Sequence, residues 1–321
     1  MGGLKKEKFR GIFAILPTPF RADLSVDYPA LESIVDFCVA CGVGGIVTPA
    51  NASEQPMLMD VERQRIIKTA VKRAAGRAAV VAGVTAANAY VAGVFTKQAC
   101  AAGADALMAM PPYIVKGDQP AVFNYYMTID KAADVPVIIQ NYPGPVGAPM
   151  SPEFMLDMCG ASDNIRYIKE ELTYSSHMIA NTLKLAEKRS NDDGARAGSG
   201  KQTAGKLWGV MCGKAGKFII EEFRRGAAGN MPACEIADVH VKIWKLCEEG
   251  NFSAAQSLLD LAQPLLNFES IYGAFAYKEV LRRRGVISAA YARSVDGQSF
   301  DDCDMKELDR IMGAVSPAFS V

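Results

Sequence analysis

Short apolar runs alternate with longer stretches of helical periodicity along the first three quarters of the chain. The eight runs begin near Gly11, Gly44, Ala79, Ala106, Pro136, Ile165, Leu207 and Gly229. Such alternation predicts parallel strands covered by helices. The runs are continuously apolar, as strands buried on both faces are. Eight units favour closure into an α/β fold of the (β/α)8 (TIM) barrel type. The alternative is a doubly wound open sheet.

The β-prone runs stop at about Glu235, and only helical patterns follow. These patterns cover residues 241–250, 252–266, Tyr277–Arg284 and Met305–Val315. We therefore expect a barrel over residues 1–235 and a helical appendage over residues 236–321. The polar segment Lys188–Lys206 is rich in Gly, Ser and Asp, which predicts a mobile loop.

The charge balance of the chain argues against several classes of partner. Lys and Arg together number 35, as do Asp and Glu, so the net charge is +0. Nucleic-acid binders usually carry a basic excess. No run approaches the roughly 18 uncharged apolar residues of a membrane span, and the basic start MGGLKKEKFR precedes no secretory apolar run. We expect a soluble, cytoplasmic protein with no nucleic-acid or membrane partner.

Cysteine and histidine usage gives no indication of a metal site. The eight cysteines are irregularly spaced among apolar neighbours, which suits reduced thiols better than a disulfide framework. The pair Cys38 and Cys41 has no second pair at metal-ligand spacing. The two histidines, His177 and His240, lie in no metal-binding motif. We therefore expect no metal.

Lys169 is the candidate nucleophile. In a barrel of this type the active site lies at the C-terminal ends of the strands. Lys169 follows the apolar pair Tyr167–Ile168 inside the sixth run. Burial disfavours the charged form of an amine, and a neutral amine is what attacks a ketone. The alternative is a lysine that ends the strand and points to solvent.

Glu171 is the candidate acid and base. Side chains on a strand alternate between its two faces, so Glu171 shares a side with Lys169 while Glu170 points the other way. A carboxylate beside a Schiff-base lysine can stabilise the iminium and move protons at the adjacent carbon. The alternative is a solvated loop residue. Gly213 follows the seventh run, where a glycine turn lets the backbone approach a substrate.

Several blocks match a known family in order and spacing. They are Pro17–Phe20, Glu54 with Asp60–Arg63 after it, Pro111–Tyr113, the strand that ends at Pro143, Ile168–Glu170, and Gly213–Cys234. Together they resemble the dihydrodipicolinate synthase / N-acetylneuraminate lyase family over most of the chain. The resemblance implies an imine between Lys169 and a 2-oxo acid, usually pyruvate. It also implies that no cofactor is needed and that the protein is a homodimer or homotetramer.

The resemblance also implies substrate-binding residues. The family grips the substrate carboxylate with backbone N–H groups and a hydroxyl in the block that is Asn51, Ala52 and Ser53 here. Asn51 and Ala52 stand where the usual threonine pair would be, so only Ser53 offers a hydroxyl. Tyr113 stands where the family often has a tyrosine that reaches a neighbouring subunit's site. A packed interface aromatic is the alternative for Tyr113.

Two departures from the family pattern change the activity that we expect. Gln140 stands where the catalytic tyrosine is usual, and Pro145 stands where the lysine-biosynthesis synthase carries an arginine. We therefore do not expect the synthase activity. We assign the proton transfers to Glu171, and expect Gln140 to hydrogen-bond the substrate or a water molecule.

One sub-branch of the family is similar to this pattern. It shares A-N-x-S-E-Q at residues 50–55, Gln140, and a glutamate two residues after the lysine. That sub-branch dehydrates 2-keto-3-deoxy sugar acids such as 2-keto-3-deoxy-L-arabonate, so we predict a carbon–oxygen lyase. The enzyme alternatives are retro-aldol cleavage that releases pyruvate and a deaminating lyase of hydroxyproline catabolism. The non-enzyme alternative is a catalytically silent 2-oxo-acid sensor.

Overall fold

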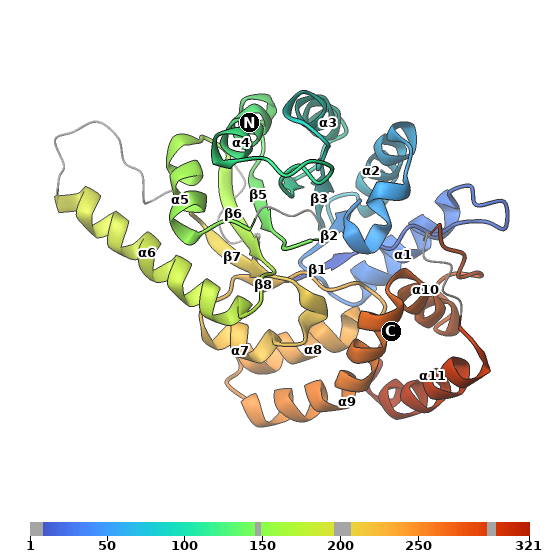
Figure 1. Cartoon of the computed structure of the whole chain (residues 1–321). Coiled ribbons are helices and arrows are strands. Elements are labelled where there is room, and N and C mark those ends of the chain that lie inside the picture. The colour runs from blue at the N-terminus through green and yellow to red at the C-terminus, as the bar shows by residue number, and fades with distance from the viewer. Residues whose placement is uncertain (1–8, 145–148, 196–206, 294–299) are drawn as a thin grey trace. The chain divides into compact units, whose positions relative to one another are not determined.

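A computed structural model describes residues 9–144, 149–195, 207–293 and 300–321. Its eight strands form a closed barrel in the order β1 to β8, with neighbours parallel (Figure 1). The strands are β1 Gly11–Ile15, β2 Gly45–Thr48, β3 Ala79–Gly83, β4 Ala106–Ala109, β5 Val137–Asn141, β6 Ile165–Glu170, β7 Gly209–Cys212 and β8 Gly229–Asn230. The (β/α)8 prediction is confirmed, and the open sheet is excluded.

Helices separate the strands, as predicted. They are α1 Tyr28–Ala40, α2 Asp60–Ala74, α3 Ala89–Ala101, α4 Gln119–Ala132, α5 Pro152–Ala161, α6 Ser175–Ala195 and α7 Ile219–Arg224. Four of these helices are preceded by an N-cap residue whose side chain accepts a hydrogen bond from a backbone N–H of the first turn. The four residues are Asp27, Asn88, Asp118 and Ser151. Such caps satisfy N–H groups that have no partner inside the helix.

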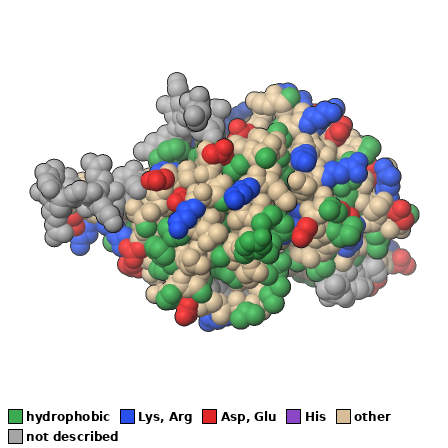
Figure 2. Space-filling model, turned by 90° about the horizontal axis from the view of Figure 1, so that it is seen from above, with side chains coloured by type: hydrophobic (Ala, Val, Ile, Leu, Met, Phe, Trp, Pro, Cys, Tyr) green, Lys and Arg blue, Asp and Glu red, His purple; other side chains and the backbone are tan. Residues whose placement is uncertain are grey.

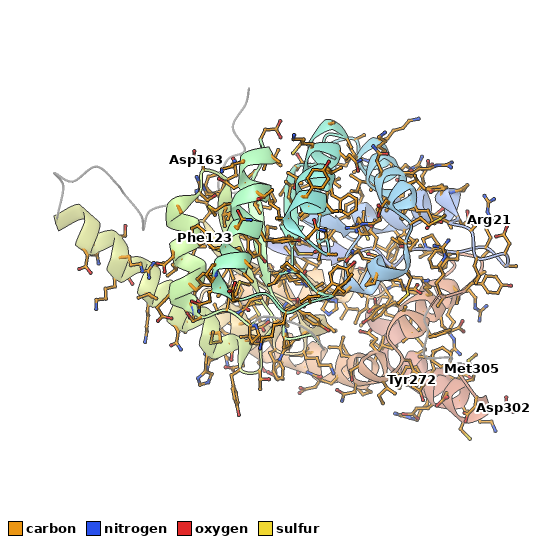
Figure 3. The ribbon with its side chains drawn as sticks, turned by 45° about the horizontal axis from the view of Figure 1, so that its top comes forward. Arg21, Phe123, Asp163, Tyr272, Asp302 and Met305 are labelled. Carbon is orange, nitrogen blue, oxygen red and sulfur yellow. The ribbon has the colours of Figure 1, made fainter. Side chains whose placement is uncertain are left out.

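After β8 the chain is helical. The helices are α8 Ala237–Glu248, α9 Phe252–Tyr272, α10 Ala274–Arg283 and α11 Asp302–Val315. The α9–α11 contact contains Phe268, Tyr272 and Phe300, whose rings have centroids 4.5–5.5 Å apart. The Tyr272 hydroxyl donates to Asp304 on α11, and Figure 3 shows Tyr272 close to Met305. Ring packing and this hydrogen bond hold the two helices together.

The predicted loop over Lys188–Lys206 is wrong for residues 188–195, which continue α6. This stretch contains no proline, and one interior glycine costs a helix only about 1 kcal/mol. The Arg189 guanidinium donates to Asp157 of α5 at 2.9 Å, which places this part of α6 against α5. Residues 196–206 lie outside the described ranges.

Two compact units make up the chain, and each is described by itself. The first comprises residues 1–10, 81–213 and 221–230, and the second comprises residues 11–80, 214–220 and 231–321. Basic and acidic side chains are interspersed on the face drawn in Figure 2. None of the helices in the described ranges combines the length and apolar character needed to cross a membrane.

Candidate active site

The register of β5, β6 and β7 places the predicted nucleophile in the first unit. Lys169 of β6 pairs with Gln140 of β5 on one side and with Met211 of β7 on the other. Residues paired across parallel strands point to the same face of the sheet. Lys169 is 1% exposed. The strand therefore buries this amine between its neighbours and does not direct it to solvent.

Glu171 is the charged partner of Lys169. The Lys169 Nζ and Glu171 Oε1 atoms are 3.1 Å apart. The Glu171 N–H donates to the Asn141 carbonyl at 3.0 Å, which extends the strand ladder one residue beyond β6. The side-chain alternation therefore continues to Glu171 and turns it to the Lys169 face. A buried ammonium without such a partner would be strongly destabilising.

Gln140 fixes the second oxygen of the same carboxylate. Its Nε2 donates to Glu171 Oε2 at 2.6 Å, and the Gln140 side chain is buried. A hydrogen bond to an ionised acceptor is shorter and stronger than a neutral one. Glu171 is thus held at both oxygens, one by Lys169 and one by Gln140. The amide orients the carboxylate but supplies no proton of its own to a reaction.

Gly213 leaves the space that Glu171 occupies. A Cβ atom at position 213 would lie 2.1 Å from Glu171 Oε1 and 2.6 Å from its Cγ. Any other residue at this turn would displace the carboxylate. The sequence suggested that glycine lets the backbone approach a substrate, and the structure shows an additional reason: Gly213 admits the Glu171 side chain.

Glu170 points to the opposite face, as expected from alternation. Its Oε2 accepts from Asn141 Nδ2 at 2.9 Å, and its Oε1 accepts from the Leu172 N–H at 2.8 Å. Burial raises the pKa of Glu170 despite these hydrogen bonds. The two carboxylates therefore have different surroundings: Glu170 is fixed by amides alone, whereas Glu171 faces an amine.

Tyr142 is a further titratable group near this carboxylate. It follows β5 two residues after Gln140, so it is directed to the same side. Burial, and secondly the Glu171 charge, raises the pKa of the Tyr142 phenol. In the sequence, Tyr142 lies two positions after Gln140, which occupies the position of the usual family tyrosine. The pairing of β5 with β6 is what brings its phenol within the field of Glu171.

The predicted carboxylate-binding block lies in the second unit. Asn51, Ala52 and Ser53 form a single 3-10 turn after β2. The Ser53 hydroxyl is fully buried, donates to the Leu16 carbonyl at 2.5 Å and accepts from the Ala50 N–H at 3.0 Å. Its only proton is thus engaged by the backbone. The predicted role of this block in binding the substrate carboxylate stays a prediction.

Tyr113 lies in the first unit, in the loop between β4 and α4. Its side chain is half-buried, while the next two residues, Ile114 and Val115, are 63% and 72% exposed. Two exposed aliphatic residues beside an aromatic one are compatible with a subunit contact. The predicted role of Tyr113 at a neighbouring subunit's site stays a prediction.

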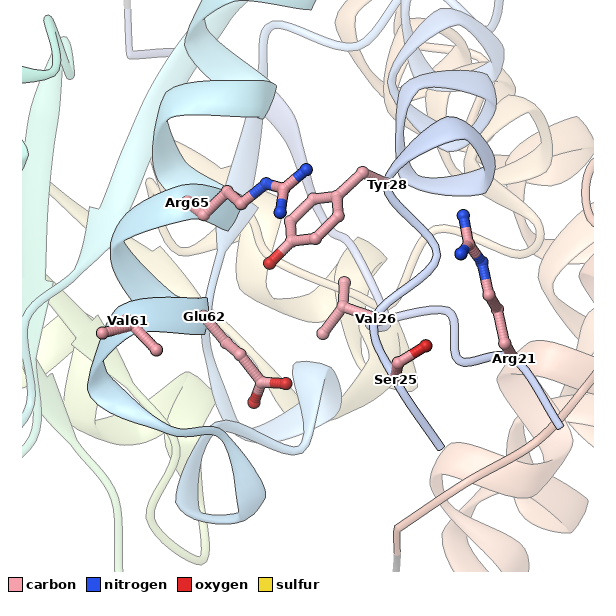
Figure 4. A pocket seen from close by; sticks show the side chains of 7 residues that line it. All are labelled: Arg21, Ser25, Val26, Tyr28, Val61, Glu62 and Arg65. Atoms are coloured by element: carbon pink, nitrogen blue, oxygen red, sulfur yellow. The ribbon is translucent and has the colours of Figure 1, made fainter. Parts of the chain in front are cut away.

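A surface hollow of about 440 Å³ in the second unit contains none of these residues (Figure 4). It is lined by Arg21, Ser25, Val26, Tyr28, Val61, Glu62 and Arg65. The Arg65 guanidinium stacks 3.8 Å from the Tyr28 ring centroid, and Glu62 is bound by Arg293. Arg65 is thus engaged by another lining residue, and Glu62 by Arg293, which does not line the hollow. Across the described residues, no three His, Cys, Asp or Glu side chains are placed to hold a metal ion.

Comparisons with known proteins identify a family to which the chain is similar. The model of the family described as "Dihydrodipicolinate synthetase family" matches residues 8–295. A 4-hydroxy-tetrahydrodipicolinate synthase of Chlorobium chlorochromatii is 33% identical over 182 residues, which cover 57% of this chain and 60% of that protein. An L-2-keto-3-deoxyarabonate dehydratase of Azospirillum brasilense is 26% identical over 290 residues, which cover 89% of this chain and 88% of that protein.

A solved structure is similar over almost the whole length. The crystal structure of the dihydrodipicolinate synthase of Rhodopseudomonas palustris superposes with a TM-score of 0.85 at 26% identity. The superposition covers 97% of this chain and 99% of that chain. The backbone of the whole barrel and of the C-terminal helices is therefore similar in the two proteins.

Proposed function

Because the chain belongs to the dihydrodipicolinate synthetase family, we propose that it is a Schiff-base-forming lyase that dehydrates a 2-keto-3-deoxy sugar acid. The observation that carries the proposal is the buried pair of Lys169 and Glu171, 3.1 Å apart. An amine in this position can attack a ketone, and a carboxylate in contact with it can move protons at the neighbouring carbon.

The first step joins enzyme and substrate. Glu171 takes a proton from the Lys169 ammonium, and the neutral amine adds to the C2 ketone. The C2 oxygen then leaves as water with the proton that Glu171 returns, which gives an iminium. The Glu171 carboxylate compensates the positive charge of this iminium as it compensates the ammonium in the free protein. The iminium withdraws electrons from C3 and makes its protons acidic, so the lysine supplies the electron sink that the reaction needs.

Elimination follows at C3 and C4. Glu171 removes a proton from C3, and the electron pair forms the enamine double bond between C2 and C3. The enamine then expels the C4 hydroxyl, which leaves as water with the proton that Glu171 returns. Hydrolysis of the imine frees Lys169, and the net change in the sugar acid is the loss of one water molecule. One carboxylate thus serves as base and then as acid.

The residues around the pair suit this chemistry better than the synthase reaction. Gln140 holds the carboxylate at 2.6 Å but carries no phenol. We therefore assign proton transfer to Glu171; the Tyr142 phenol is another titratable group that is influenced by the Glu171 charge. Pro145, where the synthase has an arginine, lies outside the described residues. Asn51, Ala52 and Ser53 are the proposed receptor for the substrate carboxylate.

The Azospirillum dehydratase supports the choice of substrate class, since it aligns over most of both chains. The synthases also match, and the Chlorobium alignment covers 60% of that enzyme. The type of reaction is therefore better supported than the particular sugar acid.

Borohydride trapping followed by product analysis tests the proposal. Incubation with pyruvate and borohydride should give one adduct, located on Lys169 by peptide mass spectrometry, and Lys169→Arg should give none. Exposure to a panel of 2-keto-3-deoxy sugar acids should then release an oxo product that is one water lighter than the substrate. An adduct on another lysine would remove the basis of the site.

The alternatives predict other products from the same experiment. Released pyruvate would identify a retro-aldol lyase, and released ammonia from an amino-substituted 2-oxo acid would identify a deaminating lyase. Binding of 2-oxo acids with no product across the panel would identify a silent sensor. No observation in the structure favours these three over dehydration.

A further inference from the structure

Glu54, directly after the proposed carboxylate receptor, has an unusual backbone conformation. It ends the turn of Asn51–Ser53 with φ 55° and ψ 38°, in the left-handed region. This conformation is unfavourable for residues other than glycine and persists where the surroundings fix it. Glu54 is 7% exposed. The contacts of the Glu54 side chain therefore help to fix the conformation of the Asn51–Ser53 turn.

Both carboxylate oxygens of Glu54 are bound by the C-terminal helical region. Lys278 of α10 donates from Nζ to Oε2, and the Arg293 backbone N–H donates to Oε1 at 2.6 Å. The separation between Glu54 and Lys278 is 224 residues along the chain. All of these residues belong to the second unit. The conformation of the turn thus depends on groups from the other end of the chain.

Within the described ranges, Glu54 is the acidic residue that forms an ion pair with the buried Lys278. It is fully buried, donates to the Tyr291 carbonyl at 2.9 Å, and its Nζ lies 4.3 Å from the centroid of the Phe20 ring. Burial lowers the pKa of Lys278 to about 8, and the Glu54 carboxylate opposes that shift. A buried ammonium is retained only where its charge is compensated. Here the compensation comes from Glu54.

Arg293 binds the segment beyond Glu54 in the same way. Its guanidinium donates to both Glu62 oxygens at 2.7 Å and to the Met57 carbonyl at 3.1 Å. Its Cζ lies 4.4 Å from the same Phe20 ring. The segment from Glu54 to Glu62, whose last two residues line the hollow in Figure 4, is thus fixed at three points. The turn has little freedom to rotate while these contacts hold.

We propose that Lys278 is a positioning residue for substrate binding: through Glu54 it sets the orientation in which the Asn51–Ser53 turn receives the carboxylate of the 2-oxo acid. This inference rests on the proposed function, since it assumes that the turn binds that carboxylate. It makes the C-terminal helices a part of the binding site. Loss of the ion pair would let Glu54 leave its strained conformation and would tilt the N–H groups of the turn.

The test compares two compounds that differ in the carboxylate. Pyruvate carries it and propanone does not, and both form a borohydride-reducible imine with an amine. Lys278→Met should raise the half-saturating pyruvate concentration by about tenfold or more, because small displacements of binding groups are costly. The trapping rate with propanone should stay unchanged. A purely structural lysine would reduce both reactions together.

Two further variants separate positioning from folding. Glu54→Gln/Lys278→Met removes both buried charges, so it should recover thermal stability but not the affinity for pyruvate. Arg284→Met breaks another buried ion pair of the same unit, with Asp238 at 2.8 Å, and should leave the pyruvate-to-propanone ratio unchanged.

Each outcome bears on one of the two proposals. Equal losses for both compounds in Lys278→Met, or pyruvate affinity restored in the double variant, would overturn the positioning role alone. A wild-type protein that gives no pyruvate adduct on Lys169 would overturn the proposed function and, with it, the positioning role. A selective loss for pyruvate in both Lys278 variants, with Arg284→Met unaffected, would support it.

Discussion

Replacement of Gly213 by alanine tests whether the position of Glu171 controls proton transfer. The new Cβ would lie 2.1 Å from Glu171 Oε1, whereas ordinary van der Waals contact begins at 3.4 Å. The carboxylate must therefore move by about 1.3 Å, the difference between these two distances. It cannot do so and also keep its 3.1 Å contact with Lys169 and its 2.6 Å contact with Gln140. The lysine itself does not have to move.

The expected effect is a selective loss of acid–base chemistry. A catalytic group misplaced by 1 Å can slow a reaction by roughly 100-fold. We expect that loss in the exchange of pyruvate methyl protons for deuterium in heavy water, followed by NMR, because exchange requires both the imine and a base. Borohydride trapping requires only the imine and should change far less. Glu171→Gln, which keeps the size of the side chain without its basic oxygen, should lose exchange in the same way.

Gly313→Ala is the matched control, because a Cβ at that position of α11 meets no atom within 4 Å. It should exchange and trap like the wild type. The reasoning would be refuted if Gly213→Ala exchanged deuterium at the wild-type rate, since Glu171 would then not be the base. It would also be refuted if trapping fell as far as exchange, because the substitution would then impair imine formation by Lys169 and not only proton transfer by Glu171.

Two predictions concern pH and stability. Burial lowers the pKa of His240 to about 4, so between pH 4 and 6.5 the unfolded chain binds more protons and stability falls as pH falls through that window. The loss amounts to about 3 kcal/mol, and His240→Gln should remove it in urea titrations at a series of pH values. Burial raises the pKa of Glu269 and also that of its neighbour Glu235. Each carboxyl therefore lowers the stability of the folded protein as the pH rises above the range where an unfolded carboxyl ionises. Glu269→Gln should therefore melt above the wild type near pH 7 but not near pH 4, and a lower melting temperature at both would contradict this.

The strands could be predicted from the sequence because a buried strand is recognisable from its own run of apolar residues. Strands β4 and β5 are buried along their whole length, and such strands leave continuous apolar runs in the sequence. The proximity of Lys169 and Glu171 was also predictable, since it follows from a two-residue spacing on one strand. The end of α6 was not predictable, because Gly and Asp after Lys188 are typical of a loop and the contact with Asp157 is not local.

The rest of the site depends on strand register and on contacts between residues far apart in the chain, which a single sequence does not reveal. Gln140 meets Glu171 because β5 aligns it with Lys169, and a shift of one residue would turn it to the other face. Gly213 was expected at a turn, but the carboxylate that requires it comes from another strand. Lys278 lies within the predicted helical pattern Tyr277–Arg284, and its partner Glu54 is 224 residues away, so no local pattern indicates the pair.

Gln140→Glu gives a direct test of how this protein works without the usual tyrosine. The substitution would place a second carboxylate 2.6 Å from Glu171, where an amide now donates. Two carboxylates at that distance hold one proton between them, and they keep it at a pH where an isolated carboxylate is ionised. A base that retains its proton cannot take another from C3, so the acid limb of the deuterium-exchange profile should move to higher pH by about one unit or more. Gln140→Leu removes the same amide without adding charge and serves as the control. If the two profiles coincided, a second carboxylate beside Glu171 would have no effect on the base. The proton transfers would then have to be assigned to another group, such as the Tyr142 phenol, whose pKa the Glu171 charge helps to raise.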